Sequence, residues 1–148
     1  KASGLNDTWI IGLYIFYNLI YALAAFPLGM LADKIGLKKM FSMGLLLFAV
    51  VYLGMATTCN AYALAAWFLL YGLYAAATEG ISKAWISNIA DKNDTATAIG
   101  TYTGFQSVFT MIASSLAGWI WLIFGSSATF LVSAVVAVFI VVFIAVCL

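Results

Sequence analysis

Six lysines and five acidic residues interrupt a 148-residue chain that otherwise carries no charged side chain. They leave three long uncharged runs, at 8–32, 40–78 and 95–148. A helix needs about 20 apolar residues to cross a hydrocarbon core of about 30 Å, so the first run predicts one membrane crossing. The other two runs are long enough to cross the membrane and return.

Polar turn residues predict where the two returns lie. Thr57-Thr58-Cys59-Asn60 predicts a hairpin in the second run, and Gly125-Ser126-Ser127 predicts one in the third. Residues able to cap a following helix precede four spans, and they are Asp7, Asn60, Asp94 and Ser127. We expect one transmembrane domain with five spans, at about 8–32, 39–57, 62–90, 95–123 and 127–148.

Composition excludes a soluble or disordered chain. Hydrophobic residues make up 66% of the sequence and charged residues 7%, whereas a soluble domain carries about 25% charged residues. Backbone polar groups in lipid must be satisfied within a helix or a closed barrel, and no strand-length alternation favours a barrel. The predicted fold class is therefore all-α, a polytopic membrane protein.

Several function classes lack the residues that they need. The net charge is +1 and the chain has no arginine, which disfavours nucleic acid as a partner. It has no histidine, and Cys59 and Cys147 each stand alone in apolar stretches, so we expect no metal site and no cofactor. Nucleophile-elbow, zinc-protease and phosphate-loop signatures are missing, so we do not expect an enzyme.

Lysine placement predicts the orientation. Two connections on one side of the membrane hold four lysines, Lys34, Lys38, Lys39 and Lys92, and Lys1 lies on the other side. The lysine-rich side is normally cytoplasmic. We therefore expect the N-terminal end outside and Leu148 near the cytoplasm. We also expect that the chain is a fragment, since Lys1 looks like part of a loop cut within a longer protein.

Glu79 and Lys83 are ionisable residues inside the predicted third span. Each costs about 2.5–3.5 kcal/mol at a helix centre, and a spacing of four places them on one helix face. Glu79 could face a water-filled cavity, where it binds a cation or exchanges a proton. Alternatively, the two could form a permanent ion pair that only orients the helix. The residues alone leave both interpretations open.

Uncharged polar and small residues suggest further contacts. Asn18 and Gln106 lie near the centres of their spans and could line a cavity or hydrogen-bond between helices, of which we favour the second. Tyr14, Tyr17 and Tyr21 share one helix face, which we interpret as a packing face. Small residues four apart predict close helix contacts at Gly100/Gly104, at Ser114/Gly118 and along Gly72, Ala76, Gly80 and Ala84.

The connection after the first span resembles a signature of the major facilitator superfamily of transporters. That signature, Gly-x-Leu-Ala-Asp-Arg-x-Gly-Arg-Lys, joins the second helix to the third and the eighth to the ninth. The segment here is Gly29-Met30-Leu31-Ala32-Asp33-Lys34-Ile35-Gly36-Leu37-Lys38-Lys39. The resemblance implies a cytoplasmic gating loop formed by Gly29, Asp33, Lys34, Gly36, Lys38 and Lys39.

The third span resembles the tenth helix of a bacterial branch of that superfamily. Thr78-Glu79-Gly80-x-x-Lys83-Ala84 is similar to the branch's Thr-Glu-Gly-x-x-Lys-Ala motif. The first span resembles the eighth helix at Tyr17-Asn18, and the last two spans resemble the eleventh and twelfth helices. The chain would then be helices eight to twelve, part of the C-terminal six-helix bundle. It departs from the branch at Leu37, Asn88, Asp91 and Thr95-Ala96.

This resemblance implies a secondary transporter of the bacterial cytoplasmic (inner) membrane that works by alternating access around a central site. It would move a small organic solute, a metabolite or a drug, by proton-coupled efflux. Glu79 and Lys83 would serve proton coupling or substrate binding, with Asn18 and Gln106 as further candidates. The expected partners are the lipid bilayer, the solute and the missing N-terminal half of the transporter.

Two other functions stay open at this point. A five-span membrane scaffold or assembly subunit would use Glu79 and Lys83 as a structural pair. An intramembrane enzyme is a third hypothesis, which the residue inventory disfavours.

Overall fold

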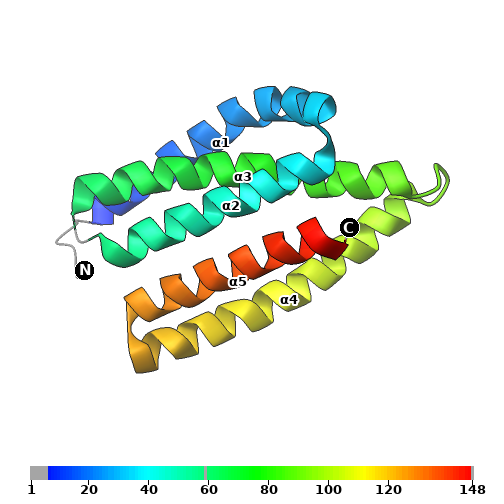
Figure 1. The fold of residues 1–148 in the computed structure, drawn as a ribbon. Coiled ribbons are helices and arrows are strands. Elements are labelled where there is room, and N and C mark those ends of the chain that lie inside the picture. The colour runs from blue at the N-terminus through cyan, green and yellow to red at the C-terminus, as the bar shows by residue number, and fades with distance from the viewer. Residues whose placement is uncertain (1–6, 59, 148) are drawn as a thin grey trace.

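The computed structural model describes residues 7–58 and 60–147, which form five helices that run back and forth along one bundle (Figure 1). They are α1 (Asp7–Ile35), α2 (Leu37–Thr57), α3 (Ala61–Ile89), α4 (Thr95–Phe124) and α5 (Ser126–Cys147). All five are long and apolar enough to cross a membrane. The predicted all-α, five-helix membrane fold is confirmed. The observed helix ends lie within three residues of the expected ones.

Two single glycines make the tightest connections. Gly36 separates α1 from α2 with φ of +95°, and Gly125 separates α4 from α5 with φ of +84°. Both angles lie in the left-handed region, where a side chain is strained, so these turns require glycine. Asn60 caps α3 as expected, because its side-chain oxygen accepts a hydrogen bond from the Tyr62 N–H at 3.0 Å.

Two other expected caps are wrong. Asp94 precedes α4 but makes no side-chain cap, since its backbone, at φ −110° and ψ 3°, is not in the extended conformation that aims a capping side chain at the helix. Ser127 is the second residue of α5, because the helix begins directly after the Gly125 turn. The Asp7 side chain lies outside the described part of the structure.

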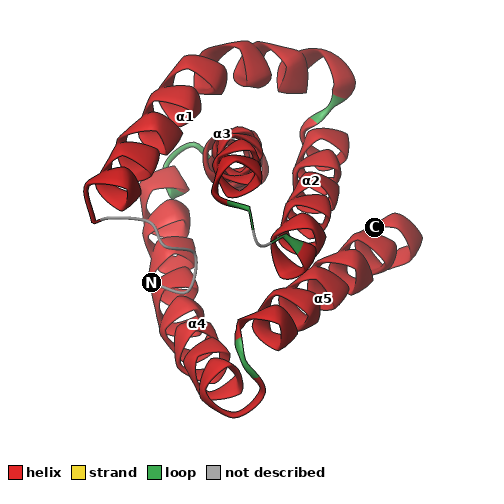
Figure 2. Ribbon diagram, turned by 90° about the vertical axis from the view of Figure 1, so that its left-hand side faces the viewer, coloured by secondary structure: helices red, strands yellow, loops and turns green. Residues whose placement is uncertain are grey.

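α3 is the central helix of the bundle. Figure 2 shows it nearly end-on, with α1 and α2 on either side and α5 beyond α2. The most extensive contacts join α2 to α3, α2 to α5 and α1 to α3. Small residues permit this closeness, since Ala75, Ala76 and Ala77 of α3 are all buried. By contrast α4, described along its whole length, buries none of its residues.

The closest contacts between helices lie at Gly44, Gly54 and Gly72. Of these three, only Gly72 belongs to the small-residue positions that we expected. A methyl group added at Gly44 of α2 would lie 2.6 Å from the Thr78 methyl carbon, and one added at Gly72 of α3 would lie 3.0 Å from the Tyr17 carbonyl oxygen. Gly54 of α2 lies against the Trp67 indole. The packing pairs expected on α4 make no close helix contact within the described chain, because α4 diverges there from α2 and α3. Added methyls there would meet nothing within 4 Å at Gly100, Gly104 or Gly118.

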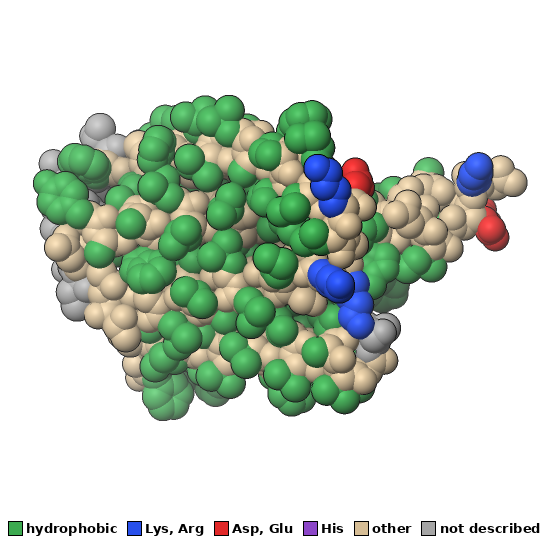
Figure 3. All heavy atoms as spheres, turned by 45° about the horizontal axis from the view of Figure 1, so that its top comes forward, with side chains coloured by type: hydrophobic (Ala, Val, Ile, Leu, Met, Phe, Trp, Pro, Cys, Tyr) green, Lys and Arg blue, Asp and Glu red, His purple; other side chains and the backbone are tan. Residues whose placement is uncertain are grey.

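The sides of the bundle are apolar, and lysines gather at one end. Phe26, Leu122 and Phe139 are 73%, 85% and 71% exposed, which suits lipid rather than water. Figure 3 shows hydrophobic side chains along the visible flank and lysines near the α1–α2 and α3–α4 connections. The described chain starts and finishes at opposite ends of the bundle (Figure 1).

Candidate functional site

Glu79 is exposed in the second half of α3, although its neighbour Thr78 is buried. The Thr78 hydroxyl donates to the Tyr74 carbonyl at 2.9 Å, and its methyl group packs against Gly44 of α2. Consecutive residues in a helix point about 100° apart. Because Thr78 is turned to α2, Glu79 is turned away from it, toward α1.

Tyrosine hydroxyls are the polar neighbours of the Glu79 carboxylate. Four of them, from two helices, lie close enough to interact with its charge, and they belong to Tyr17, Tyr21, Tyr71 and Tyr74. A phenol is a neutral group, so nearby tyrosines do not cancel the charge of a carboxylate.

Stacked tyrosine rings join α1 to α3 beside this carboxylate. The Tyr17 and Tyr71 rings stack with centroids 5.5 Å apart and planes at 29°, and the Tyr71 and Tyr74 centroids lie 5.4 Å apart. Tyr17 therefore packs against α3, as we predicted for the tyrosine face of α1. Tyr21, four residues on, instead faces Glu79, and Tyr14 is exposed.

A groove of about 270 Å³ runs between α1 and α3 past Tyr21. Its lining residues are Tyr21, Ala25, Gly29, Ala32 and Asp33 of α1, Leu37 of α2, and Ala76, Gly80, Ile81 and Ala84 of α3. The two helices touch at Gly72, but a methyl group added at Gly29 or Gly80 would meet nothing within 4 Å. The small residues of α3 beyond Ala76 therefore line a groove, where the spacing predicted a packing face.

The other expected site residues are spread over the bundle. Lys83 is exposed one turn beyond Glu79 and is not among the residues that line the groove. Asn18 is exposed, and its amide donates to the Tyr14 carbonyl at 2.8 Å within its own helix. Gln106 is exposed on α4. Of the four residues expected to bind the solute or the proton, Glu79 is thus the one that lies near the tyrosines of both α1 and α3.

The expected gating loop forms the end of the groove. Gly29 and Asp33 line the groove, and Gly36 makes the turn that follows. Lys34 and Lys39 are exposed and Lys38 is half-buried. Beneath the loop, side chains of α1, α2 and α3 form a buried cluster, made of Ala32, Met40, Ala77 and Ile81. This packing holds the loop beside α3, and a gating role stays a prediction.

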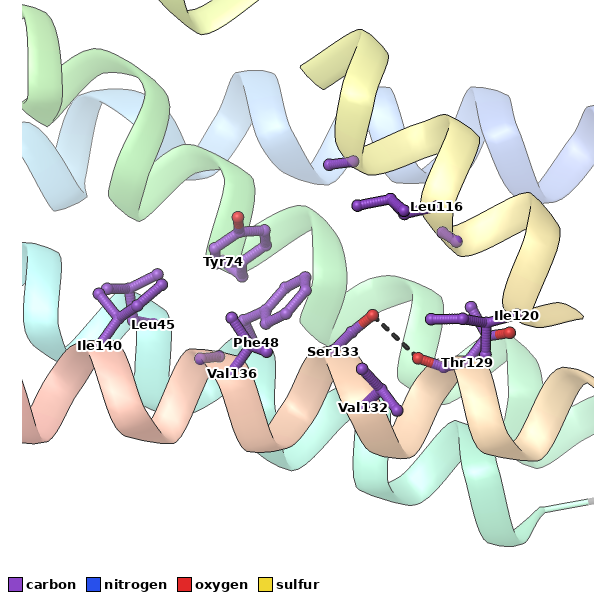
Figure 4. A pocket seen from close by; sticks show the side chains of 13 residues that line it. Leu45, Phe48, Tyr74, Leu116, Ile120, Thr129, Val132, Ser133, Val136 and Ile140 are labelled. Carbon is purple, nitrogen blue, oxygen red and sulfur yellow. Dashed lines mark hydrogen bonds between the residues drawn. The ribbon is translucent and has the colours of Figure 1, made fainter. Parts of the chain in front are cut away.

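A second cavity, of about 400 Å³, lies between α2, α3, α4 and α5 and is almost entirely apolar (Figure 4). The Tyr74 and Phe48 rings, with centroids 4.8 Å apart, lie at one side of it. Its Ser133 hydroxyl donates to the Thr129 carbonyl at 2.9 Å. No charged side chain is among the lining residues, so the cavity suits apolar groups.

Tyr71 and Tyr74 were not predicted as part of the site. Tyr71 lies eight residues before Glu79, so helical spacing could have placed the two on one face. No spacing within one helix could have paired them with Tyr17 of α1.

Within the described ranges, no three His, Cys, Asp or Glu side chains come together to hold a metal ion. The arrangement offers one carboxylate, phenol donors and a groove.

Comparisons with known proteins identify relatives of this chain. The sequence profile described as Major Facilitator Superfamily matches residues 2–148. An uncharacterized MFS-type transporter of Methanocaldococcus jannaschii is 36% identical over 128 residues, which cover 86% of this chain. The match spans 32% of that protein's length, so the chain corresponds to about a third of this relative. No solved structure matches the chain significantly.

Proposed function

The chain belongs to the Major Facilitator Superfamily, and we propose that it forms part of a secondary active transporter for a small organic solute. It would contribute helices eight to twelve and move the solute by alternating access. We place it in the bacterial cytoplasmic membrane, with the lysine-rich end inside and the N-terminal end outside. Its partners would be lipid, the solute and the rest of the transporter.

The observation that carries this proposal is the setting of Glu79. Glu79 is exposed, lies near Tyr21 and directly precedes Gly80, which lines the groove. The groove continues to Asp33 in the last turns of α1. An ionisable residue inside a membrane span is costly and marks an ion or proton pathway, so we assign proton coupling to Glu79.

We propose efflux as the direction of transport. Protons that enter from outside and leave to the cytoplasm would be exchanged for a solute that leaves the cell. Lys83, one turn nearer to the lysine-rich end, would stabilise the ionised carboxylate after the proton has left. Asn18 and Gln106 are candidates for contact with the solute in the complete transporter.

The test uses the complete transporter reconstituted in proteoliposomes with an imposed pH gradient. Glu79→Gln keeps the size of the side chain but removes the exchangeable proton, so gradient-driven flux should fall by about 100-fold or more, as expected for a lost proton-transfer group. Asp91→Asn, in the exposed 90–94 connection, is the matched control and should leave flux near normal. Undiminished flux in the Glu79→Gln protein would exclude the coupling role, whereas no gradient-driven flux in the unmodified protein would favour the scaffold function.

A further inference from the structure

We propose that a bend of α1 at Pro27 holds the groove between α1 and α3 open, and that straightening α1 at this residue closes the groove. The inference rests on the proposed function only for its link to transport, because the bend can be tested without a solute. It follows from the place of the proline, the contacts of α1 on either side of it, and the small residues that line the groove.

Pro27 lies inside α1, which runs from Asp7 to Ile35. A proline has no N–H to donate to the carbonyl four residues earlier, which here is the carbonyl of Leu23. The proline ring also clashes with that carbonyl, so the helix opens on the side of the proline and bends toward the opposite side. Because Pro27 is the only proline in the sequence, this is the point at which α1 bends most easily.

Pro27 lies on the face of α1 opposite to the groove. Tyr21, Ala25 and Gly29 line the groove and follow a spacing of four along one helix face. Pro27 lies midway between Ala25 and Gly29, about 200° around the helix axis from each, and it is exposed. A bend at Pro27 therefore makes α1 concave toward α3, and Figure 2 shows α1 arching over α3 in this way.

Packing holds α1 on both sides of this bend. Before it, a methyl group added at Gly72 of α3 would lie 3.0 Å from the Tyr17 carbonyl oxygen. After it, Ala32 is 1% exposed in a buried cluster with Met40 of α2 and Ile81 of α3. A bowed helix whose ends are held lies farther from its neighbour at its middle than a straight helix does. The bow therefore accounts for the groove of about 270 Å³ beneath it.

Small residues on both walls allow the groove to close. Ala25 and Gly29 line it on α1, and they are matched on α3 by small residues. Those of α3 are Gly80 and Ala84. Helices in membranes approach most closely where such residues meet, yet a methyl group added at Gly29 or Gly80 meets nothing within 4 Å. The structure is thus the open form of a helix pair that can also pack closely, and alternating access requires two such shapes.

Disulfide formation across the groove measures closure. Both helices run toward the lysine-rich end, so equal steps along each from the Tyr17–Gly72 contact bring Ala25 opposite Gly80. The complete reconstituted transporter carries Ala25→Cys and Gly80→Cys and no other cysteine, and mass spectrometry follows bridging under a mild oxidant. Two cysteines bridge when their Cβ atoms come within about 4.5 Å. Pro27→Ala restores the missing hydrogen bond and straightens α1, so bridging should become about tenfold faster or more.

An equal or slower rate of bridging in the Pro27→Ala protein would overturn the proposal. Phe26→Ala, which changes an exposed neighbour and leaves the backbone hydrogen bonds intact, is the matched control and should keep the original rate. A second cysteine pair, at Ile20 and Gly72, lies at the contact before the bend, where an added methyl would be 3.3 Å from the Ile20 Cβ. This pair should bridge equally fast with and without Pro27, and an equal acceleration of both pairs would also overturn the proposal.

The hinge and the transport function fail separately. If Pro27→Ala leaves bridging unchanged while the pH gradient drives Glu79-dependent flux, proton coupling stands and the hinge falls. If Pro27→Ala accelerates bridging but the unmodified transporter shows no gradient-driven flux, the hinge stands and the transport function falls.

Discussion

Replacing Gly54 with alanine tests the packing of α2 against α3 most sharply. The added methyl carbon would lie 2.7 Å from Cδ2 of Trp67 and closer still to two other indole carbons. Carbon atoms pack at about 3.5–4.0 Å, so the indole must move by roughly 1 Å or more. The ring is not free to do so, because its Nε1–H donates to the Thr58 hydroxyl at 3.2 Å.

The expected cost combines three terms. Overpacking costs about 1–3 kcal/mol, and loss of the Thr58 hydrogen bond costs about 0.5–1.5 kcal/mol. The replacement also stabilises the helix by about 0.5–1 kcal/mol, since glycine is less favourable than alanine inside a helix. Gly54→Ala should therefore lower the free energy of unfolding by about 2 kcal/mol, which thermal unfolding in detergent, followed by circular dichroism, will show as a Tm several degrees lower.

Two further variants decide whether the indole is the cause. Gly118→Ala on α4 gains the same helix propensity in open space, so its Tm should stay level or rise slightly. In a Trp67→Leu background the clash is gone, so Gly54→Ala should no longer destabilise. A wild-type Tm for Gly54→Ala, or an equal loss with and without the indole, would refute this account of the α2–α3 contact.

Two other expectations follow from the groove and the lysines. Gly80→Leu should lower gradient-driven flux by about tenfold or more at unchanged Tm, because a methyl at this position meets no atom within 4 Å and a longer side chain can extend into the groove. Wild-type flux in that variant would exclude the groove as a path. Cysteine replacing Asp94 should react with a membrane-impermeant maleimide from the cytoplasmic side and cysteine replacing Tyr62 from the outside, and the reverse pattern would invert the proposed orientation.

Much of the fold can be predicted from the sequence because the length of an uncharged run and the residues at its ends are properties of a single segment of the chain. Runs without charged residues can be divided by the length needed to cross a membrane, and Gly125 and Asn60 end or begin helices through their own backbone and side-chain chemistry. The Asp94 cap failed because a capping bond also needs a particular backbone conformation, which the 90–94 connection does not provide.

The candidate site was predicted only in part, since it depends on how helices are rotated and spaced. Glu79 stands out in the sequence because a charge inside a span is costly. Its tyrosine neighbours on α1 depend on the register between α1 and α3. That register also decides that Gly72 is packed while Gly80 of the same stripe faces a groove. Spacing along one helix does not contain this information.

Chemical modification of Glu79 is the most direct test of the claim that its carboxylate is reached by water and exchanges protons. A water-soluble carbodiimide is applied to the reconstituted transporter over a range of pH, and mass spectrometry locates the modified carboxyl groups, with the exposed Asp91 as internal reference. If the carboxylate is reached by water, Glu79 will be modified by the reagent, as the exposed Asp91 is. Glu79 that resists the reagent at every pH, yet reacts once Lys83→Met removes the neighbouring ammonium, would instead reveal a sealed ion pair and contradict the account.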